Sequence, residues 1–396
     1  MKSRSVVFFE STATECLEKK YSYTAKFDAI INKLKIGDRV KNKQVAIKMH
    51  VGEGENFSTV HPYLIGRLIR EIKKHEGKPY IIDVPEQIEK AHLRGYTENV
   101  LGCKLIPVAG FRDNYFIEKE VNYKGLKMLR MGGNVKDADI LINVSHVKSH
   151  NSTGFGAAIK NLAVGCYTQK TRNQMHRTMQ YDSYWDPAKC KDPEKLQKVC
   201  PYGAIQWKKN RLKVEFDSCN QCMRCIQVDN DKCLQINRRN FGSFFEICAI
   251  AANLVLSEIG KENCYHINVA LDMTERCDCW GFTTGNILPD LGFLGSRDIL
   301  GIDKATLDLT ADKSLIVENV AKTSEIVDNP NLHPFAKLNG PYKDPYLQIY
   351  YGEKYRLGNL EYILKKVISP IKIEKRIRSI FPEAIPIYQK VSKLGS

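Results

Sequence analysis

The sequence has 396 residues, of which 43% are hydrophobic and 27% are charged, and this composition excludes a disordered or low-complexity chain. The net charge of +15 favours anionic partners, but no nucleic-acid-binding module is visible. We therefore expect a small anionic substrate and no nucleic acid. The apolar run at residues 6–9 is too short for a signal peptide, and no later run is long enough to span a bilayer, so the sequence predicts a cytoplasmic protein without a transmembrane segment.

Three short β-branched runs, at residues 44–49, 79–84 and 139–144, predict strands. Between the first two, residues 60–75 have the apolar periodicity of a helix, which Gly77 closes. This alternation predicts an α/β fold with a mixed or mostly parallel sheet and helices on both faces. In such sheets, ligands bind beyond the carboxyl ends of the strands.

The composition changes near residue 184, where cysteines, lysines and polar turns replace this alternation. We interpret that segment as an inserted ferredoxin-like iron-sulfur module. Core-type sequence resumes with a predicted helix at 244–259 and a predicted strand at 266–271. The last part is rich in Pro, Tyr and Lys and carries a basic tail after Lys366. The predicted units are an α/β lobe, the insert, a second part of the α/β body and an accessory C-terminal extension, at residues 1–183, 184–236, 237–328 and 329–396.

Thirteen cysteines in a reducing compartment indicate metal ligands, reactive thiols or buried apolar residues rather than disulfides. Cys219, Cys222 and Cys225 form a C-x2-C-x2-C loop that suits three corners of an iron-sulfur cubane. Cys200, which precedes Pro201, is typical of the remote fourth ligand. These four residues predict one [4Fe-4S] cluster. A zinc site is a weaker alternative, because no second CxxC pair follows the triplet.

A complete two-cluster ferredoxin would have three more cysteines in its first half, but only Cys190 stands there. Asp229 occupies the place where the second half should supply its own fourth cysteine. The sequence therefore predicts one cluster per chain. Whether Cys190 or Cys233 ligates metal stays open.

A second group of candidate residues follows the predicted strand ends. Histidine can ligate metal or transfer protons near neutral pH, and a lysine can bind an anion or attach a cofactor covalently. We therefore predict a pocket that binds a small anionic substrate and is compatible with a second metal or an organic cofactor. Its candidate catalytic residues are His50, His146, His150, Lys160 and His176.

Cys277 and Cys279 follow the predicted strand at 266–271 and should reach the same edge of the sheet. A Cys-x-Cys sequence places two sulfurs close together, which favours metal binding or redox chemistry. The alternative is a turn with buried structural cysteines.

Several segments together resemble the iron-sulfur family known as domain of unknown function 362. These segments are IKMHVGE (47–53), SHVKSHNSTGFGAAIKNLAVGC (145–166), LDMTERCDCWG (271–281) and ILPDLGFLGSRDILGIDKATLDL (287–309), together with the cysteine motif. Members of that family usually carry two ferredoxin motifs, so the incomplete first half here is a departure. The family name supplies no reaction.

The order and spacing of His150, Lys160 and His176 are also similar to the catalytic segment of the nickel-pincer lactate racemase family. That resemblance implies the location of a site. It does not imply its chemistry, because lactate racemases lack both the ferredoxin insert and the Cys-x-Cys sequence.

Three functions fit these observations. The first is an iron-sulfur oxidoreductase that receives electrons from a ferredoxin or flavodoxin-type donor and passes them to the pocket. The second is a non-redox metalloenzyme, an isomerase or lyase, with a structural cluster. The third is a non-catalytic electron carrier, which has little use for the histidine and lysine group.

Overall fold

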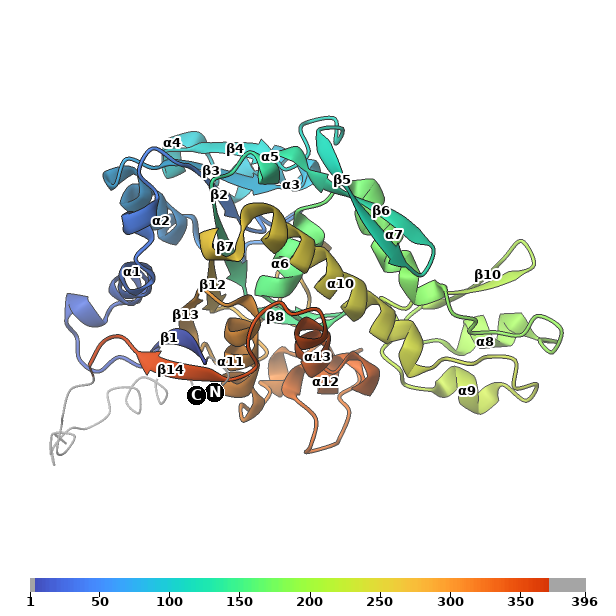
Figure 1. Ribbon diagram of the computed structural model, residues 1–396. Coiled ribbons are helices and arrows are strands. Elements are labelled where there is room, and N and C mark those ends of the chain that lie inside the picture. The colour runs from blue at the N-terminus through green and yellow to red at the C-terminus, as the bar shows by residue number, and fades with distance from the viewer. Residues whose placement is uncertain (1–3, 370–396) are drawn as a thin grey trace, which may run out of the picture.

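The structure is a computed structural model that describes residues 4–369. Residues 370–396, which hold most of the predicted basic tail, lie outside the described residues. The central element is an eight-stranded sheet (Figure 1). From one edge to the other its strands are β14 (Tyr362–Lys366), β1 (Ser5–Ser11), β13 (Gly292–Ser296), β12 (Cys264–Ala270), β7 (Ile140–His146), β2 (Gln44–Lys48), β3 (Lys78–Asp83) and β4 (Lys104–Pro107).

The sheet is mixed and mostly parallel, as predicted. Only β13 runs antiparallel to its two neighbours, and every other neighbouring pair of these eight strands is parallel. The three strands predicted in the first 150 residues are β2, β3 and β7, and the predicted strand at 266–271 is β12. β7 continues two residues further than expected, to His146. The carboxyl ends of β2, β3, β7 and β12 therefore meet at one edge of the sheet.

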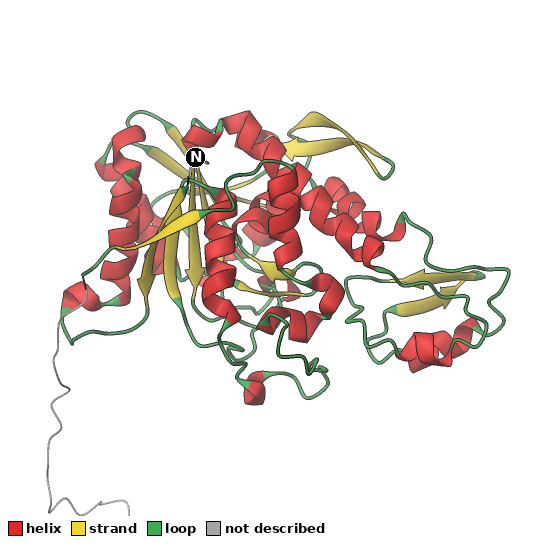
Figure 2. Cartoon of the chain, turned by 60° about the horizontal axis from the view of Figure 1, so that its bottom comes forward, coloured by secondary structure: helices red, strands yellow, loops and turns green. Residues whose placement is uncertain are grey.

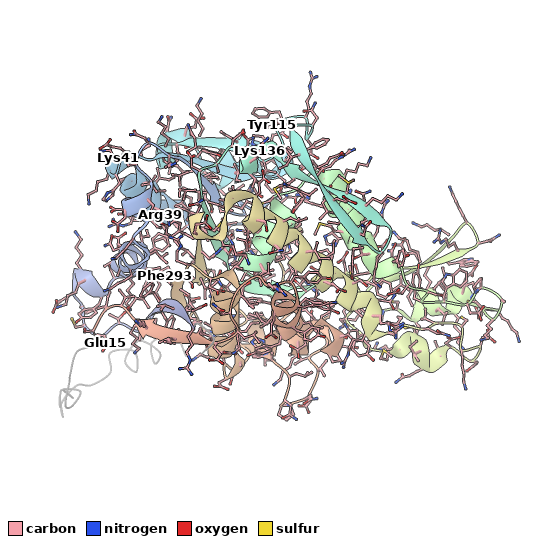
Figure 3. The ribbon with its side chains drawn as sticks, in the orientation of Figure 1. Glu15, Arg39, Lys41, Tyr115, Lys136 and Phe293 are labelled. Atoms are coloured by element: carbon pink, nitrogen blue, oxygen red, sulfur yellow. The ribbon has the colours of Figure 1, made fainter. Side chains whose placement is uncertain are left out.

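Helices cover both faces of the sheet (Figure 2). Side chains alternate between two cores, so that Val45 and Ile47 of β2 face one core and Ala46 faces the other. The first core is closed by α1 (Tyr23–Leu34) and α2 (Pro62–Lys74), and the second by α6 (Ala158–Gly165), α10 (Arg238–Ile259) and α11 (Ile299–Ala311). Phe293 of β13 lies in the first core (Figure 3), where its ring centroid is 5.5 Å from that of Phe27.

In residues 4–369, three two-stranded ladders lie outside the main sheet: β5 (Phe116–Tyr123) with β6 (Leu126–Gly132), β8 (Lys148–His150) with β9 (Gly154–Gly156), and β10 (Ile205–Lys208) with β11 (Arg211–Val214). The remaining α-helices are α3 (Pro85–Glu89), α4 (Glu98–Leu101), α5 (Gly133–Lys136), α7 (Gln169–Arg177), α8 (Pro193–Val199), α9 (Arg224–Val228), α12 (Pro334–Asn339) and α13 (Tyr346–Lys354).

The cysteine-rich segment at 184–236 holds α8, the β10–β11 ladder and α9. Figure 1 shows these elements at the side of the molecule, away from the eight-stranded sheet. The segment thus has two short helices and a hairpin. Its ferredoxin-like character and its boundaries stay predictions.

α10 begins at Arg238, six residues before the predicted start. Asn237 explains the earlier start, because its side chain accepts a hydrogen bond from the amide of Arg239 at 2.9 Å and caps the helix. Contrary to expectation, this helix is long and apolar enough to cross a membrane by length and composition alone. Most of it is buried against the sheet and neighbouring helices, which is typical of a core helix.

The predicted C-terminal extension contributes one strand, β14, to the main sheet. β14 pairs in parallel with β1 and forms one edge of the main sheet, with Ser5 opposite Tyr362. The hydroxyl of Tyr362 donates to Asp308 of α11 at 2.8 Å. The composition of this segment did not predict an edge strand, because an edge strand needs few apolar residues. Most of β14 is exposed.

Candidate functional site

A cavity of about 300 Å³ lies at the carboxyl edge of the sheet. Its walls come from the ends of β2, β3 and β7, from α6 and α7, and from the turn that follows β12. The cavity brings together all of the predicted pocket residues. These are His50, His146, His150, Lys160, His176, Cys277 and Cys279. Their chemical roles stay predictions, and their shared location is a feature of the fold.

A buried network joins the ends of β2 and β3. The ammonium of Lys48 donates to Oδ1 of Asp83 at 3.1 Å and to the side-chain oxygen of Asn161 at 2.9 Å. The other oxygen of Asp83 contacts Nδ1 of His50 at 3.0 Å and the amide of Val51 at 3.0 Å. Burial alone would raise the pKa of Asp83, but Lys48 and His50 hold it well below its usual value. Nε2 of His50 is buried and has no hydrogen-bond partner in the described part of the chain.

A second buried network fixes the turn after β12. The carboxylate of Asp278 accepts from Nζ of Lys148 at 2.8 Å and from Nδ1 of His146 at 2.9 Å. Ser58 donates to the same carboxylate at 3.2 Å. Burial opposes ionisation of Asp278, but His146 and Lys148 hold its pKa well below the usual value. Nε2 of His146 also faces the carbonyl of Leu271 at 2.9 Å, so both ring nitrogens are occupied, and His146 serves to position Asp278.

The loop after β2 packs closely on this turn. The amide of Glu53 donates to the carbonyl of Asp278 at 3.2 Å. A side chain at Gly54 would place its Cβ 2.7 Å from the carbonyl oxygen of Gly281, so this approach requires glycine. The short 3-10 helix Asp278–Trp280 is therefore held from both sides.

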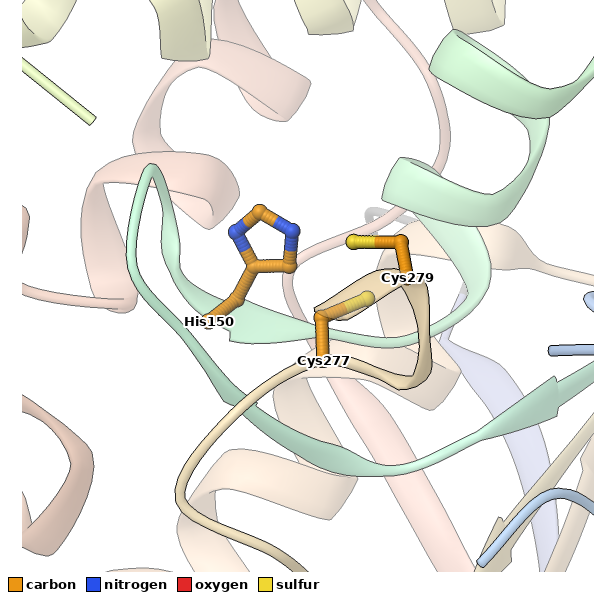
Figure 4. Close-up of side chains that lie close together, drawn as sticks. All are labelled: His150, Cys277 and Cys279. Atoms are coloured by element: carbon orange, nitrogen blue, oxygen red, sulfur yellow. The ribbon is translucent and has the colours of Figure 1, made fainter. Parts of the chain in front are cut away.

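Cys277, Cys279 and His150 form a compact group inside the cavity. The two sulfurs and a ring nitrogen lie within 4.8 Å of one another, and the side chains point toward each other (Figure 4). This arrangement could hold a metal ion. The thiol of Cys279 hydrogen bonds to Cys277 and, with Lys160 and Lys148 nearby, holds the pKa of Cys277 well below its usual value despite burial. The same hydrogen bond raises the pKa of Cys279. Burial, assisted by Lys160, lowers the pKa of His150 to about 4.

Lys160 and Arg172 are cations that line the cavity without a carboxylate partner in the described residues. Both line the cavity from α6 and α7 and are half-buried. In residues 4–369, no carboxylate lies within the 4.0 Å ion-pair distance of either side chain. Of the three described carboxylates that line the cavity, Asp83 pairs with Lys48, Asp217 faces the imidazole of His176, and Glu53 accepts from the amide of Gln87 at 3.2 Å. The cavity can therefore bind an anion beside Lys160.

His176 and Asp217 link the cavity to the cysteine-rich segment. Nδ1 of His176 contacts the carboxylate of Asp217 at 3.0 Å, and its ring stacks on Phe244 with centroids 4.3 Å apart. Lys343 donates to the carbonyls of Asp217 at 3.2 Å and of Cys219 at 2.7 Å. Burial lowers the pKa of Lys343 to about 8. Asp217 thus lines the cavity while lying two residues before a predicted cluster ligand.

A family model described as "Domain of unknown function (DUF362)" matches residues 45–308, two thirds of the chain. The chain belongs to this family. The match confirms the resemblance seen in the sequence. No curated protein matches this DUF362 chain.

Two solved structures resemble this DUF362 protein at low identity. One is a Thermotoga maritima protein, with 10% identity and a TM-score of 0.35, and it is aligned over 63% of this chain and 50% of its own. The other is the lactate racemase apoprotein from Thermoanaerobacterium thermosaccharolyticum, with 12% identity and a TM-score of 0.32, aligned over 67% and 50%. This chain thus matches about half the length of each structure.

The predicted cluster cysteines of the DUF362 protein lie close enough to influence one another. Burial, followed by the charges of Cys219, Cys200 and Cys222, raises the pKa of Cys225 to about 12. Burial likewise raises the pKa of Cys219. The amide of Ala204 donates to the sulfur of Cys200 at 3.3 Å. Cys200, Cys219 and Cys222 thus all act on the pKa of Cys225, although the loop and Cys200 come from different elements.

Cys190 and Cys233 form a separate pair. Burial and a hydrogen bond with Cys190 raise the pKa of Cys233 above its usual value, and Asp229 contributes to the same shift. The carboxylate of Asp229 also accepts from the amide of Leu234 at 2.7 Å, so it closes a local turn.

Sequence reasoning did not single out Lys48, Asp83 or Asp217. Lys48 and Asp83 are the last residues of β2 and β3, and a charged residue near the end of an apolar strand is the signal that could have found them. Asp217 carries no such signal, because only the fold brings it to His176.

Proposed function

We propose that this DUF362 protein is an iron-sulfur oxidoreductase that acts on a small anionic substrate in the cavity. Cys200, Cys219, Cys222 and Cys225, within a ferredoxin-like module at 184–236, would hold one [4Fe-4S] cluster. Such a cluster supplies single electrons, and a ferredoxin or flavodoxin-type protein would be their source. Lys160 and Arg172 would bind the anionic group of the substrate.

The position of Asp217 carries this proposal. Its carboxylate contacts His176 at 3.0 Å and lines the cavity, and its backbone continues directly into the Cys219 loop. The ammonium of Lys343 donates to the backbone carbonyls of Asp217 and Cys219, which joins the cavity residue to the start of the Cys219 loop. A purely structural cluster would not need this adjacency.

The four thiols suit a metal cluster. The pKa values of Cys225 and Cys219 are raised, because burial and neighbouring sulfurs disfavour several thiolates in one place. Metal ions relieve that repulsion and bind the deprotonated form. Each thiolate of a cubane ligates a different iron, so its ligands lie farther apart than those of a single ion.

The proposal is tested by reducing the protein anaerobically and following reoxidation of the cluster spectrum after small anions with a reducible group, such as keto or unsaturated carboxylates, are added as oxidants. We expect at least one such anion to reoxidise the wild-type protein and to fail with Lys160→Met, whose iron content should be unchanged. Lys304→Met is the matched control, because Lys304 is a partly exposed lysine paired with Asp308 on α11, remote from the cavity. Equal reoxidation in both variants would contradict a substrate site at Lys160.

A non-redox metalloenzyme, an isomerase or lyase, is the second candidate. The mutual distance of 4.8 Å or less among His150, Cys277 and Cys279 favours it, because three ligands beside an open cavity are typical of catalytic metal sites. Elemental analysis separates the two candidates. Iron alone supports the oxidoreductase, and one additional zinc or nickel per chain that is lost in Cys277→Ser supports the metalloenzyme.

A further inference from the structure

The hydrogen bonding of His150 argues against its use as a metal ligand. The amide of Ser152 donates to Nδ1 of His150 at 3.1 Å, so Nδ1 carries a lone pair and the neutral ring keeps its proton on Nε2. Nε2 is buried and has no hydrogen-bond partner in the described residues. A neutral imidazole that ligates metal through Nε2 needs its proton on Nδ1, facing an acceptor. His50 has that arrangement with Asp83, whereas the ring of His150 lies beside the sulfurs of Cys277 and Cys279 without it.

The spacing of Cys277 and Cys279 suits a disulfide. The helical backbone at Asp278 places the two Cα atoms roughly 5–6 Å apart, within the range that disulfides span. The sulfurs already lie within 4.8 Å of each other. Cys279 is exposed and Cys277 is buried, yet both line the cavity. Asp278, anchored by Lys148 and His146, keeps the turn in place in either redox state.

We propose that Cys277 and Cys279 are a redox-active dithiol that reduces small anionic disulfides in the cavity. This inference rests on the proposed oxidoreductase function and names its substrate class. The N–H of His150 donates to the reacting sulfur, and Lys160 binds the anionic group of the substrate. Thiol-disulfide exchange is the two-electron chemistry that such a pair performs.

The proposed reaction consists of two successive thiol-disulfide exchanges, followed by reduction of the cysteine pair. One thiolate of the pair attacks a sulfur of the substrate RSSR, the S–S bond breaks, and RS⁻ leaves. The second thiolate attacks the resulting mixed disulfide and releases the second RS⁻, while a bond forms between Cys277 and Cys279. Two electrons from the ferredoxin or flavodoxin-type donor, with two protons from solvent, return the pair to the dithiol. The sum is RSSR plus two electrons and two protons giving two RSH.

Dithiobis(nitrobenzoate), a small disulfide with two carboxylates, is the probe. The anaerobic full-length protein is treated with it, and its non-reduced peptides are analysed by mass spectrometry. We expect Cys277 and Cys279 to be recovered as one internal disulfide without an adduct. Cys279→Ser should stop at a nitrobenzoate adduct on Cys277. Cys16→Ser, which changes a thiol outside the cavity, should behave like wild type.

The roles of His150 and Lys160 are tested by rate. His150→Leu should slow the exchange roughly tenfold, and His150→Gln, which keeps an N–H donor, should recover part of the rate. Lys160→Met should lower the rate with the anionic probe more than the rate with neutral dipyridyl disulfide, by roughly fivefold. Equal effects on both probes would overturn the role of Lys160.

Separate nitrobenzoate adducts on both cysteines would overturn the dithiol. A zinc or nickel ion that protects both thiols until a chelator removes it would do the same, and would support the metalloenzyme. Cys222→Ser separates a failure of the proposed cluster from a failure of the proposed dithiol. If that variant keeps its iron, the proposed cluster is wrong and the dithiol is unaffected. If wild-type protein with full iron content forms no internal disulfide, only the dithiol is wrong.

Discussion

Cys225 and Cys277 are both buried thiols, yet their surroundings shift their pKa values in opposite directions. Around Cys225, burial and three neighbouring sulfurs raise the pKa to about 12. Around Cys277, the thiol of Cys279 and the ammonium groups of Lys160 and Lys148 outweigh burial and lower it. The site of Cys225 brings several sulfurs together without enough positive charge to stabilise their thiolates. The site of Cys277 surrounds a single thiolate with a hydrogen-bond donor and two lysines.

The difference separates two uses of cysteine in one chain. A site that disfavours thiolates becomes stable when metal ions supply the missing charge. A site that stabilises a thiolate with fixed lysines already has its counter-charge and is suited to nucleophilic or redox chemistry. The Cys219 loop therefore fits a cluster, and the Cys277–Cys279 turn fits a reactive pair.

The largest expected effect is the loss of the cluster. Cys222→Ser should remove most of the iron and of the brown absorbance, because a cubane that loses a loop thiolate has no nearby replacement. Wild-type protein should contain about four irons per chain. Cys16, also half-buried but remote from the motif, is the matched control, and Cys16→Ser should keep its iron. Equal iron loss in both variants would mean that the ligands are wrongly assigned. About eight irons per chain in wild type would indicate a second cluster, with Cys190 and Cys233 among its ligands.

Asp278→Asn should have the largest effect on stability. The substitution leaves Lys148 and His146 buried without their carboxylate, which costs about 3–5 kcal/mol for a buried ion pair that loses one partner. Chemical denaturation of the two proteins measures the change. Glu361→Gln is the control, because it breaks the exposed pair with Arg4 and should cost less than about 1 kcal/mol. A similar small loss for Asp278→Asn would show that the turn is not held by this network.

Much of this arrangement was visible in the sequence. The β-branched runs at 44–49, 79–84 and 139–144 form β2, β3 and β7. Short apolar runs that alternate with helices bury their side chains by pairing into a sheet that the helices cover. The seven predicted pocket residues share one cavity, because parallel strands end at a common edge.

Other features depend on tertiary contacts that no local pattern encodes. Gly292 to Ser296 forms the antiparallel β13, and only pairing with both β1 and β12 defines it as a strand. Nδ1 of His50 faces the carboxylate of Asp83, whereas Nδ1 of His150 accepts from the amide of Ser152. These contacts determine which ring nitrogen carries the proton, and each depends on the fold around its own ring. The edge strand β14 was missed because four of its five residues are exposed.

His333 tests whether burial alone is enough to lower the pKa of a histidine in this protein, as it is proposed to do for His150 in the cavity. Burial lowers the pKa of His333 to about 4, as it does for His150, but His333 lies away from the cavity. A histidine with a lowered pKa contributes stability above its unfolded pKa of about 6.5, and this contribution is lost as pH falls toward the folded value. His333→Asn keeps a side chain that can cap α12, as His333 does for Phe335 at 3.1 Å. As the pH is lowered from 6.5 to 4, the free energy of unfolding should decrease in both proteins. The decrease should be about 2 kcal/mol smaller for His333→Asn than for wild type, as measured by denaturation at each pH. An unchanged pH dependence would show that His333 does not titrate as a buried group.

The last prediction concerns the thiolate of Cys277 itself. Between about pH 6 and 9, alkylation by iodoacetamide should depend less on pH at Cys277 than at an ordinary cysteine, since the thiolate is the reactive form and the surroundings of Cys277 lower its pKa. At Cys225, in protein stripped of iron, the rate should rise steeply over the same range, since its pKa is raised. Cys279 supplies the largest stabilising interaction, so Cys279→Ala should slow alkylation of Cys277 at pH 7 by roughly tenfold. Cys279→Ser keeps a hydroxyl donor and should retain more of the rate, which separates the loss of a hydrogen bond from the loss of a sulfur. Peptide mass spectrometry resolves the two cysteines, and parallel pH profiles for Cys225 and Cys277 would remove the distinction between the two sites.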